Sequence, residues 1–351
     1  MRGWGVERLL LGLRPAHLAL AIGLVCAAGC QTTAPAEESV VVAPSWPREP
    51  SVARVRWVSE IRGPADLGIR PGLLRRLWNW VAGEQSPSLV RPHGLAMDPE
   101  GRLWVADPGA RRVHVFDIPG RRYFAIPGRD DPALMSPIAI AHDEQGVAYV
   151  SDSAKGVIRR FDRQGRDLGD WDGQGALQRP TGLAFDPQTG VLWVADTGNH
   201  RLLAFDRNGR IRRFVGERGR ELGRFNFPTH LALDAGGQLF VTDSLNFRVQ
   251  ILTRDGDPLS AFGHAGDGPG AFSKPKGVAL DRDGHVYVVD SLFDNVQIFD
   301  RQGQLMLHFG DRGAAPGQFW LPGGIHIAGG DRIYVADGFN QRIQLFEYLG
   351  D

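Results

Sequence analysis

Cysteine is nearly absent from this 351-residue chain, which contains only Cys26 and Cys30. A framework of several disulfides, a four-cysteine zinc site and a RING-type ubiquitin ligase are therefore excluded. Net charge is also missing, because 40 Lys and Arg side chains balance 40 Asp and Glu side chains. A dedicated nucleic-acid-binding protein carries a positive excess, so nucleic acid is not expected as a partner.

A long hydrophobic run is missing from the N-terminus as well. Arg2, Arg8 and Arg14 precede the apolar run Leu18–Val25, which is too short to span a bilayer as a helix. This order is typical of a secretory signal peptide, so we expect residues 1–29 to be removed on export. A signal peptide cut nearby without lipidation is the alternative.

The end of this segment, Ala27-Ala28-Gly29-Cys30, resembles the lipobox of bacterial lipoproteins. The resemblance implies that Cys30 becomes the mature N-terminus and carries a diacylglycerol on its thiol. Burial of an acyl chain in a bilayer is favourable by about 0.8 kcal/mol per methylene, so acyl chains form a durable anchor. By the same resemblance, Gln31 in place of Asp favours the outer membrane of the cell envelope. Residues 30–50 lack periodicity and are expected to form a flexible tether.

A sequence unit recurs six times in the rest of the chain. It reads Pro-x-Gly-Leu-Ala-x-Asp, a glycine turn, Leu-x-Val-Ala-Asp, a short loop and Arg-Val-x-x-Phe-Asp. Alternating β-formers bounded by turn residues predict four strands in each copy. The copies begin at Pro92, Pro137, Pro180, Pro228, Pro275 and Pro322. Their second acidic residues, spaced 44 to 47 residues apart, are Asp107, Asp152, Asp196, Asp243, Asp290 and Asp337.

A four-stranded unit of about 45 residues is typical of a propeller blade. The sequence therefore predicts an all-β fold, a six-bladed β-propeller of four-stranded antiparallel blades over residues 91–351. The best copy, Asp196-Thr197-Gly198-Asn199-His200-Arg201, resembles the NHL repeat; the Gly-His and Trp-Asp markers of WD40 repeats are missing. This resemblance covers residues 91–348.

The sixth copy ends at Tyr348 without a fourth strand, which would leave a sheet edge open. Residues 51–63 contain an apolar and polar alternation with a period of two. We expect this segment to close blade six by pairing with Gln344–Tyr348. Residues 64–90 then connect it to blade one through one short helix at 72–84.

The repeated aspartates are expected to accept backbone N–H groups in turns, because each occurs at the same place in its copy. Asp281-Arg282-Asp283-Gly284 faintly resembles a calcium loop, but the later ligands of such a loop are absent. The first strand of each blade lines the channel, so the residue after each proline is a candidate for chemistry. These residues are His93, Ile138, Thr181, Thr229, Lys276 and Gly323.

Two enzyme comparisons bear on the channel. The lyase that completes peptide amidation is similar in a Pro-His-Gly motif, where three histidines bind zinc. Only His93 matches that motif here; His230 and His326 fall at other offsets, and Phe339 replaces a tyrosine. Lactonase-like propellers imply carboxylate and amide ligands, which the channel positions lack. No metal, cofactor or catalytic set is therefore expected, although His93, His230 and Lys276 could bind a small anion.

The loops after the second strands lie on the same face as the Pro-x-Gly starts. In copies one to three they carry the basic residues Arg111, Arg112, Lys155, His200 and Arg201, and in copies four to six the apolar residues Leu245, Phe247, Leu292, Phe293 and Phe339. An apolar patch edged by charge is typical of a partner site. Arg201, Arg248 and Arg342 follow the repeat pattern, so they are candidates either for this face or for ties between blades.

The expected function is binding or scaffolding by a monomeric, lipid-anchored propeller, with an envelope protein, a peptide or a glycan as partner. A propeller enzyme, lyase or hydrolase, with a metal at the channel is the alternative. The helix at 72–84 carries an apolar stripe of Leu73, Leu74, Leu77, Trp78 and Val81. It is equally expected to cover the apolar patch itself, and membrane contact is a third role for it.

Overall fold

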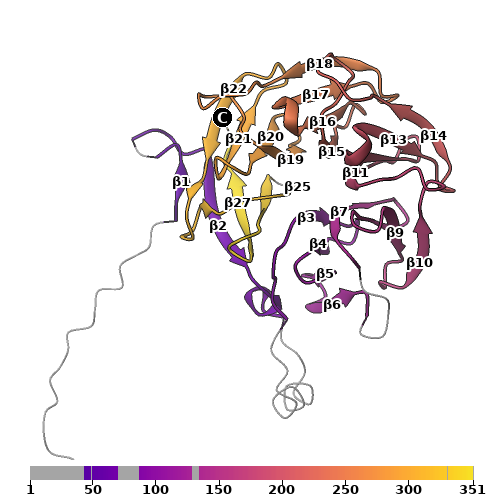
Figure 1. Cartoon of the computed structure of the whole chain (residues 1–351). Helices are drawn as coiled ribbons and strands as arrows, with labels where there is room; N and C mark the ends of the chain where they lie inside the picture. The colour runs from indigo at the N-terminus through magenta and orange to yellow at the C-terminus, as the bar shows by residue number, and fades with distance from the viewer. Residues whose placement is uncertain (1–42, 49, 70–86, 129–133, 330, 351) are drawn as a thin grey trace, which may run out of the picture. The chain divides into compact units, whose positions relative to one another are not determined.

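The first five copies of the repeat each fold into a four-stranded antiparallel sheet, and the sixth copy supplies three strands of a sheet that N-terminal strands complete. Together the sheets confirm the predicted all-β, six-bladed propeller (Figure 1). The computed structural model describes residues 43–48, 50–69, 87–128, 134–329 and 331–350. All of these belong to one unit, Ala43–Asp351.

The strands follow one another outward from the channel in every blade. Blade one contains β3 (Gly94–Met97), β4 (Leu103–Asp107), β5 (Arg112–Asp117) and β6 (Arg122–Ile126). Blade two contains β7 (Pro137–His142), β8 (Ala148–Asp152), β9 (Val157–Phe161) and β10 (Asp167–Trp171). Blade three contains β11 (Pro180–Asp186), β12 (Val191–Asp196), β13 (Arg201–Phe205) and β14 (Ile211–Val215). Blade four contains β15 (Pro228–Leu233), β16 (Leu239–Asp243), β17 (Arg248–Leu252) and β18 (Pro258–Phe262).

Blade five contains β19 (Pro275–Leu280), β20 (Val286–Asp290), β21 (Asn295–Phe299) and β22 (Leu305–Phe309). Blade six contains β25 (Ile325–Ala328), β26 (Arg332–Asp337), β27 (Arg342–Tyr348), β2 (Val55–Ile61) and β1 (Ser45–Trp46). The short pieces outside the blades are the strand pair β23 (Asp311–Arg312) and β24 (Gln318–Phe319), and the 3₁₀ turns η1 (Pro64–Leu67), η2 (Thr197–Asn199) and η3 (Ser244–Asn246).

The first strands of the blades form the inner ring. Each contacts the first strands of both neighbours, in the order β3, β7, β11, β15, β19, β25 and back to β3. The glycine of the Pro-x-Gly motif makes this approach possible. A Cβ on Gly182 would lie 2.6 Å from the carbonyl oxygen of Thr229 in the next blade, closer than real Cβ atoms approach. Gly94 meets the carbonyl of Ile138 in the same way.

The ring closes where the sequence predicts. In β2, Val55 pairs with Tyr348 and Ile61 pairs with Ile343, so the N-terminal strand supplies the missing fourth strand of blade six. Closure by an antiparallel strand removes the open edge and joins the two ends of the unit by backbone hydrogen bonds.

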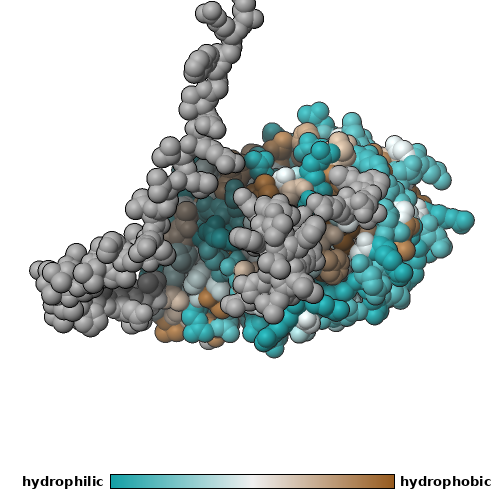
Figure 2. Space-filling view, turned by 90° about the horizontal axis from the view of Figure 1, so that it is seen from below, coloured by the Kyte–Doolittle hydropathy of each residue, from teal (hydrophilic) through white to brown (hydrophobic). Residues whose placement is uncertain are grey.

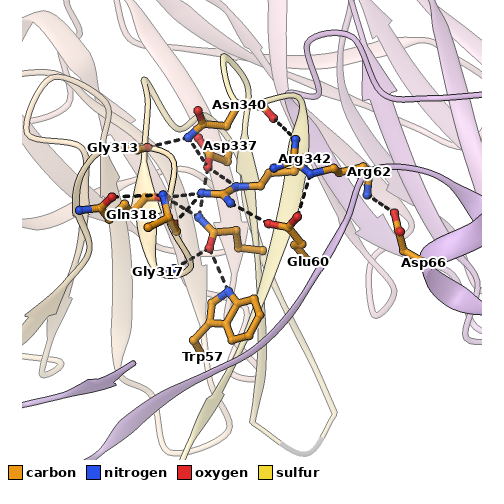
Figure 3. A network of polar contacts seen from close by, with 12 residues as sticks. Trp57, Glu60, Arg62, Asp66, Gly313, Gly317, Gln318, Asp337, Asn340 and Arg342 are labelled. Atoms are coloured by element: carbon orange, nitrogen blue, oxygen red, sulfur yellow. Dashed lines mark hydrogen bonds and ion pairs between the residues drawn. The ribbon is translucent and has the colours of Figure 1, made fainter. Parts of the chain in front are cut away.

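Arg342 ties this closing strand to the last blade (Figure 3). Its Nε donates to Asp337 Oδ2 at 2.8 Å, and its Nη1 donates to Glu60 Oε2 of β2 at 2.6 Å. Its Nη2 donates to the carbonyls of Ala315 and Gln318 at 2.9 and 2.8 Å. Burial would raise the pKa of Glu60, but Arg62 and Arg342 together hold it below its usual value.

The hydrophobic core lies between adjacent sheets rather than within one sheet. Trp193 of blade three packs in one cluster with Phe225 and Val241 of blade four, and Trp104 of blade one packs with Phe161 of blade two. Each such side chain contributes about 1.5–3 kcal/mol on burial. A single blade could not bury these side chains, so the blades stabilise one another.

Two expectations about the N-terminal segments need comment. The prediction of a flexible tether over residues 30–50 is wrong near its C-terminal end. There Ser45 and Trp46 form β1, which pairs with Arg56 and Val55. Trp46 is buried against Phe309 and Phe346, because its large apolar ring gains more from that contact than from solvent. The predicted helix at 72–84 lies outside the described residues. Within the part that the structure describes, no helix is long and apolar enough to cross a bilayer.

Candidate functional site at the channel mouth

The repeated aspartate fixes the loops at one end of each blade. Asp107 accepts hydrogen bonds from the backbone N–H groups of Val90 and Arg91, at 2.7 and 2.9 Å. Asp152 accepts from Met135 and Ser136 at the same two distances. The predicted role of these aspartates as turn acceptors is confirmed. The residues just before each first strand are thereby held beside the loop after the second strand, on one face of the ring.

A cavity of about 360 Å³ opens at the centre of this face. The predicted channel residues His93, Thr181, Thr229, His230 and Lys276 all line it. Its other lining residues are Ser136, Ile138, Ser153, Ala154 and Arg179. We call this cavity the mouth pocket. Ligand pockets in proteins begin at about 300 Å³, so the mouth pocket is large enough for a small ligand or one or two residues of a peptide.

An irregularity in the strands brings neighbouring residues to the pocket. The register of β15 against β16 shifts between Pro228 and Leu231, as expected of a β-bulge. Strict alternation would send Thr229 and His230 to opposite faces of the sheet. With the shift, both side chains reach the pocket.

The two histidines of the pocket are neutral and stacked. The ring centroids of His93 and His230 lie 5.4 Å apart with nearly parallel planes. Burial and the charge of Lys276 lower the pKa of His93 to about 4, and burial with both of these neighbours lowers the pKa of His230 well below its usual value. His93 Nδ1 donates to the carbonyl of Ile138 at 3.2 Å, which leaves Nε2 as an acceptor.

His230 has no such partner. The residue is 8% exposed, and within the described residues neither ring nitrogen forms a hydrogen bond. A neutral imidazole carries one N–H donor and one acceptor, and a buried polar group without a partner costs about 1–3 kcal/mol. The pocket therefore holds a donor that a ligand could satisfy.

Lys276 and Arg179 make the pocket positive. Burial, together with Lys274 and Arg179 nearby, lowers the pKa of Lys276 to about 8, so most of the ammonium groups stay charged at pH 7. The pocket lining contains no Asp or Glu. The two threonines do not offset this charge, since Thr181 Oγ1 bonds the carbonyl of Thr229 at 2.8 Å and Thr229 Oγ1 bonds Ser244.

This donor set does not suit a metal. A zinc site needs three converging neutral or negative ligands, whereas the mouth pocket offers two histidines beside two cations. Elsewhere, Asp281, Asp283 and His285 place ligand atoms within 4.8 Å of one another. There Asp281 already accepts from the backbone of Asp283 and His285 and from His285 Nδ1, so the turn is satisfied internally.

The comparisons with known proteins agree with the fold. Residues 89–116, 177–205 and 225–252 match the sequence profile of the NHL repeat. The chain contains NHL repeats. The resemblance stated from the sequence is thus confirmed, and we refer to the unit Ala43–Asp351 as the NHL propeller. No curated protein matches the chain.

Solved structures share the propeller fold at low sequence identity. A protein of unknown function from Bacteroides thetaiotaomicron is 17% identical with a TM-score of 0.63, over 84% of this chain and 75% of its own. Virginiamycin B lyase from Staphylococcus aureus is 17% identical with a TM-score of 0.55, over 74% of this chain and 96% of its own. An auxiliary nutrient binding protein from Bacteroides ovatus is 13% identical with a TM-score of 0.59, over 74% and 69%. At these identities the likeness shows the fold alone.

Exposed apolar side chains lie on the mouth face of the NHL propeller, in every blade except blade three. Leu245, Leu292 and Phe339, which the sequence assigns to this face, are 44%, 53% and 41% exposed. The structure adds three similarly exposed residues just before first strands. We call the six the apolar rim: Val90, Met135, Leu245, Leu292, Trp320 and Phe339. Phe247 and Phe293 are half-buried, and Phe247 packs against a core cluster between blades four and five.

Seen edge-on to the ring, the NHL propeller presents a mainly hydrophilic surface (Figure 2). Hydrophobic residues in that view form small groups among hydrophilic ones.

The assignment of repeat-pattern arginines to the binding face needs correction. Arg342 is 1% exposed and fully engaged inside blade six, so it is wrong as a binding residue. Arg201 and Arg248 occupy the same place in their blades and pair with Asp196 and Asp243, at 3.2 and 2.9 Å. A guanidinium fits the buried carboxylate and loop carbonyls of the blade, so these arginines tie loops together.

The remaining basic residues of the face are partly engaged. Lys155 Nζ forms an ion pair with Asp170 Oδ2 at 2.8 Å. Arg111 donates from Nε to the carbonyl of Leu134, while Arg112 is exposed. Within the described residues Arg111 and Arg112 have no carboxylate partner, so this face keeps positive charge beside the mouth pocket as well as in it.

Sequence reasoning missed Arg179 and three rim residues. Their signal is the register of the repeat, because Arg179 directly precedes Pro180, while Val90, Met135 and Trp320 lie two residues before the corresponding prolines. Once the blade aspartate is known to hold that backbone, these side chains must project at the mouth.

Proposed function

We propose that this NHL propeller is a binding protein of the cell envelope, anchored by lipid on Cys30, that recognises a partner protein through its mouth face. The observation that carries the proposal is the apolar rim on the same face as a positive pocket. Half-exposed apolar side chains gathered on one face are costly in water and gain on burial against a partner.

The arrangement matches the energetics of recognition. Interfaces derive most of their affinity from a few central side chains, with large apolar anchors surrounded by polar contacts. Trp320 and Phe339 lie against each other with ring centroids 5.6 Å apart, and Arg91 covers the Phe339 ring at 4.6 Å. This cluster is a preformed anchor, because its rings are held before any partner arrives.

Co-purification from envelope membranes tests the proposal. Leu292→Asp together with Phe339→Asp places charges on the rim without entering the core, unlike a change at half-buried Phe247. Leu259→Asp is the matched control, because Leu259 is 47% exposed on the outer strand β18. We expect the rim variant to lose its partner and the control to keep it. A folded rim variant that retains every partner would contradict the proposal.

A propeller enzyme is the second candidate, and one observation favours it. His93 Nε2 is an acceptor beside the neutral His230 and the lysine of lowered pKa, a combination able to move protons. Virginiamycin B lyase shares only the fold with this chain. Metal analysis of the purified protein separates the candidates, since one tightly held zinc or calcium ion per chain would favour the enzyme.

A further inference from the structure

We propose, on the basis of the binding function above, that the mouth pocket binds a carboxylate of the partner, with Lys276, Arg179 and the His230 N–H as its donors. The chemical class of the ligand is an acidic peptide group, either a C-terminal α-carboxylate or an Asp or Glu side chain. Nothing in the repeat pattern requires this chemistry, because the residue after the proline is not fixed: it is His, Ile, Lys or Gly in four blades and Thr in the other two.

The first step is charge. Lys276 and Arg179 both line the pocket, and within the described residues neither forms an ion pair. The blade aspartates nearest to them are occupied by backbone N–H groups, as Asp290 is by Ser273 and Lys274. Lys276 is partly buried and Arg179 is exposed at the mouth, and two cations at a pocket whose lining has no carboxylate lower the energy of an anion that enters.

The second step is the unpartnered donor. His230 is buried beside these cations, and its ring nitrogens are free of hydrogen bonds within the described residues. Since His93 and His230 stay neutral at pH 7, they do not add charge, and His230 can donate one N–H to an oxygen. A carboxylate has two oxygens with about four acceptor positions, so it can take Lys276, Arg179 and His230 together.

The third step is the surroundings of the pocket. A cavity of about 360 Å³ accepts one or two residues of a peptide, and the rest would cross the apolar rim. On the side of blades four and five, a polyphosphate or a nucleic acid that extended from the pocket would meet the exposed apolar side chains Leu245 and Leu292. The apolar rim therefore favours a peptide over an extended polyanion.

The experiment uses the full chain, immobilised and exposed to pools of short randomised peptides. The first pool has a free C-terminus and no Asp or Glu, the second is C-terminally amidated but contains Asp and Glu, and the third is amidated without them. Glucuronate is added as a competing anion from outside the peptide class. The variants are Lys276→Met, His230→Phe and, as a charge-matched control, Arg213→Met on the outer strand β14, whose guanidinium pairs with Asp257.

We expect the first or the second pool to be retained and the third to be lost. Retention of the first alone identifies a C-terminal carboxylate, and retention of the second identifies an acidic side chain. Lys276→Met and His230→Phe should each lower the affinity for the retained peptide about 10- to 100-fold, which is the loss expected for a charge-assisted hydrogen bond. Arg213→Met should leave affinity within about two-fold of the starting chain.

Three outcomes overturn the carboxylate proposal. In the first, the third pool is retained as strongly as the other two pools. In the second, Lys276→Met keeps full affinity, and in the third, glucuronate binds while no peptide does. The first of these leaves the proposed function standing if Leu292→Asp with Phe339→Asp still abolishes retention. Loss of all pools together with unchanged co-purification of the rim variant removes both proposals.

Discussion

We expect Arg342→Met to destabilise the NHL propeller far more than the same change at Arg201 or Arg248. The three arginines hold equivalent positions, five residues after a buried aspartate, and each pairs with that aspartate. They differ in burial, since 26%, 15% and 1% of the side chains of Arg201, Arg248 and Arg342 are exposed. Methionine keeps the length of the aliphatic stem, so the change isolates the guanidinium.

The magnitude follows from what remains after the change. Asp337 is fully buried, and burial already raises its pKa despite hydrogen bonds from Trp320, Asn340 and Arg342. Removing one partner of a buried pair costs about 3–5 kcal/mol, a large share of the roughly 5–15 kcal/mol that separates folded from unfolded proteins. At Arg201, where solvent can replace the lost contact, we expect about 1 kcal/mol.

Guanidinium chloride unfolding followed by tryptophan fluorescence measures the three free energies of unfolding. A double-mutant cycle with Glu60→Gln separates the contribution of ring closure, because Glu60 belongs to the closing strand and contacts only Arg342 of the three arginines. We expect a coupling of about 1 kcal/mol. Equal losses in all three variants, or a loss below about 1 kcal/mol for Arg342→Met, would refute this reasoning.

Three further predictions follow from single features. Lys276→Met should raise the thermal midpoint at pH 7 while weakening carboxylate binding, because it removes a cation that the fold penalises. The pKa of Lys276 is about 8 in the folded chain and 10.5 in its usual state, so the stability of the unmodified chain should rise as the pH increases from 8 to 10.5. Thermal melts at several pH values should show the difference in midpoint between the two chains narrowing over this range. Gly182→Ala should cost about 1–3 kcal/mol through overpacking against the next blade, whereas Gly268→Ala, with open space around it, should be neutral in the same melts. Cys30→Ser should release the protein from membranes on fractionation; retention in the membrane pellet would argue against lipidation.

Much of the fold was predictable because local patterns repeat. A period of two, glycine turns and a blade aspartate recur in each copy, so the copies independently support the same blade structure. Closure was predictable for a different reason: the sixth copy lacked a strand, and the alternation at Val55–Ile61 was an unassigned strand of matching length. The short strand that contains Trp46 was not predicted, because two residues are too few to show a periodicity.

The mouth pocket was only partly predictable. His93, Thr181, Thr229 and Lys276 follow one rule of position, and the structure places all of them on the pocket. Arg179 lies outside that rule, and the presence of both Thr229 and His230 depends on the register shift in β15. The same shift recurs after the motif prolines of β7, β11 and β19, so it belongs to the repeat, but the strict alternation of side chains used to predict the strands does not reveal it.

The sequence by itself determined the number of blades, their strand order and the strand that closes the ring, since these depend on periodicity and on counting strands. Only the tertiary structure decided which side chains face a ligand. Arg201, Arg248 and Arg342 share one spacing in the sequence, yet Arg342 is buried by the closing strand while Arg201 stays partly exposed. Burial depends on residues distant in the chain, so identical local patterns can lead to a structural tie in one blade and a partly exposed group in another.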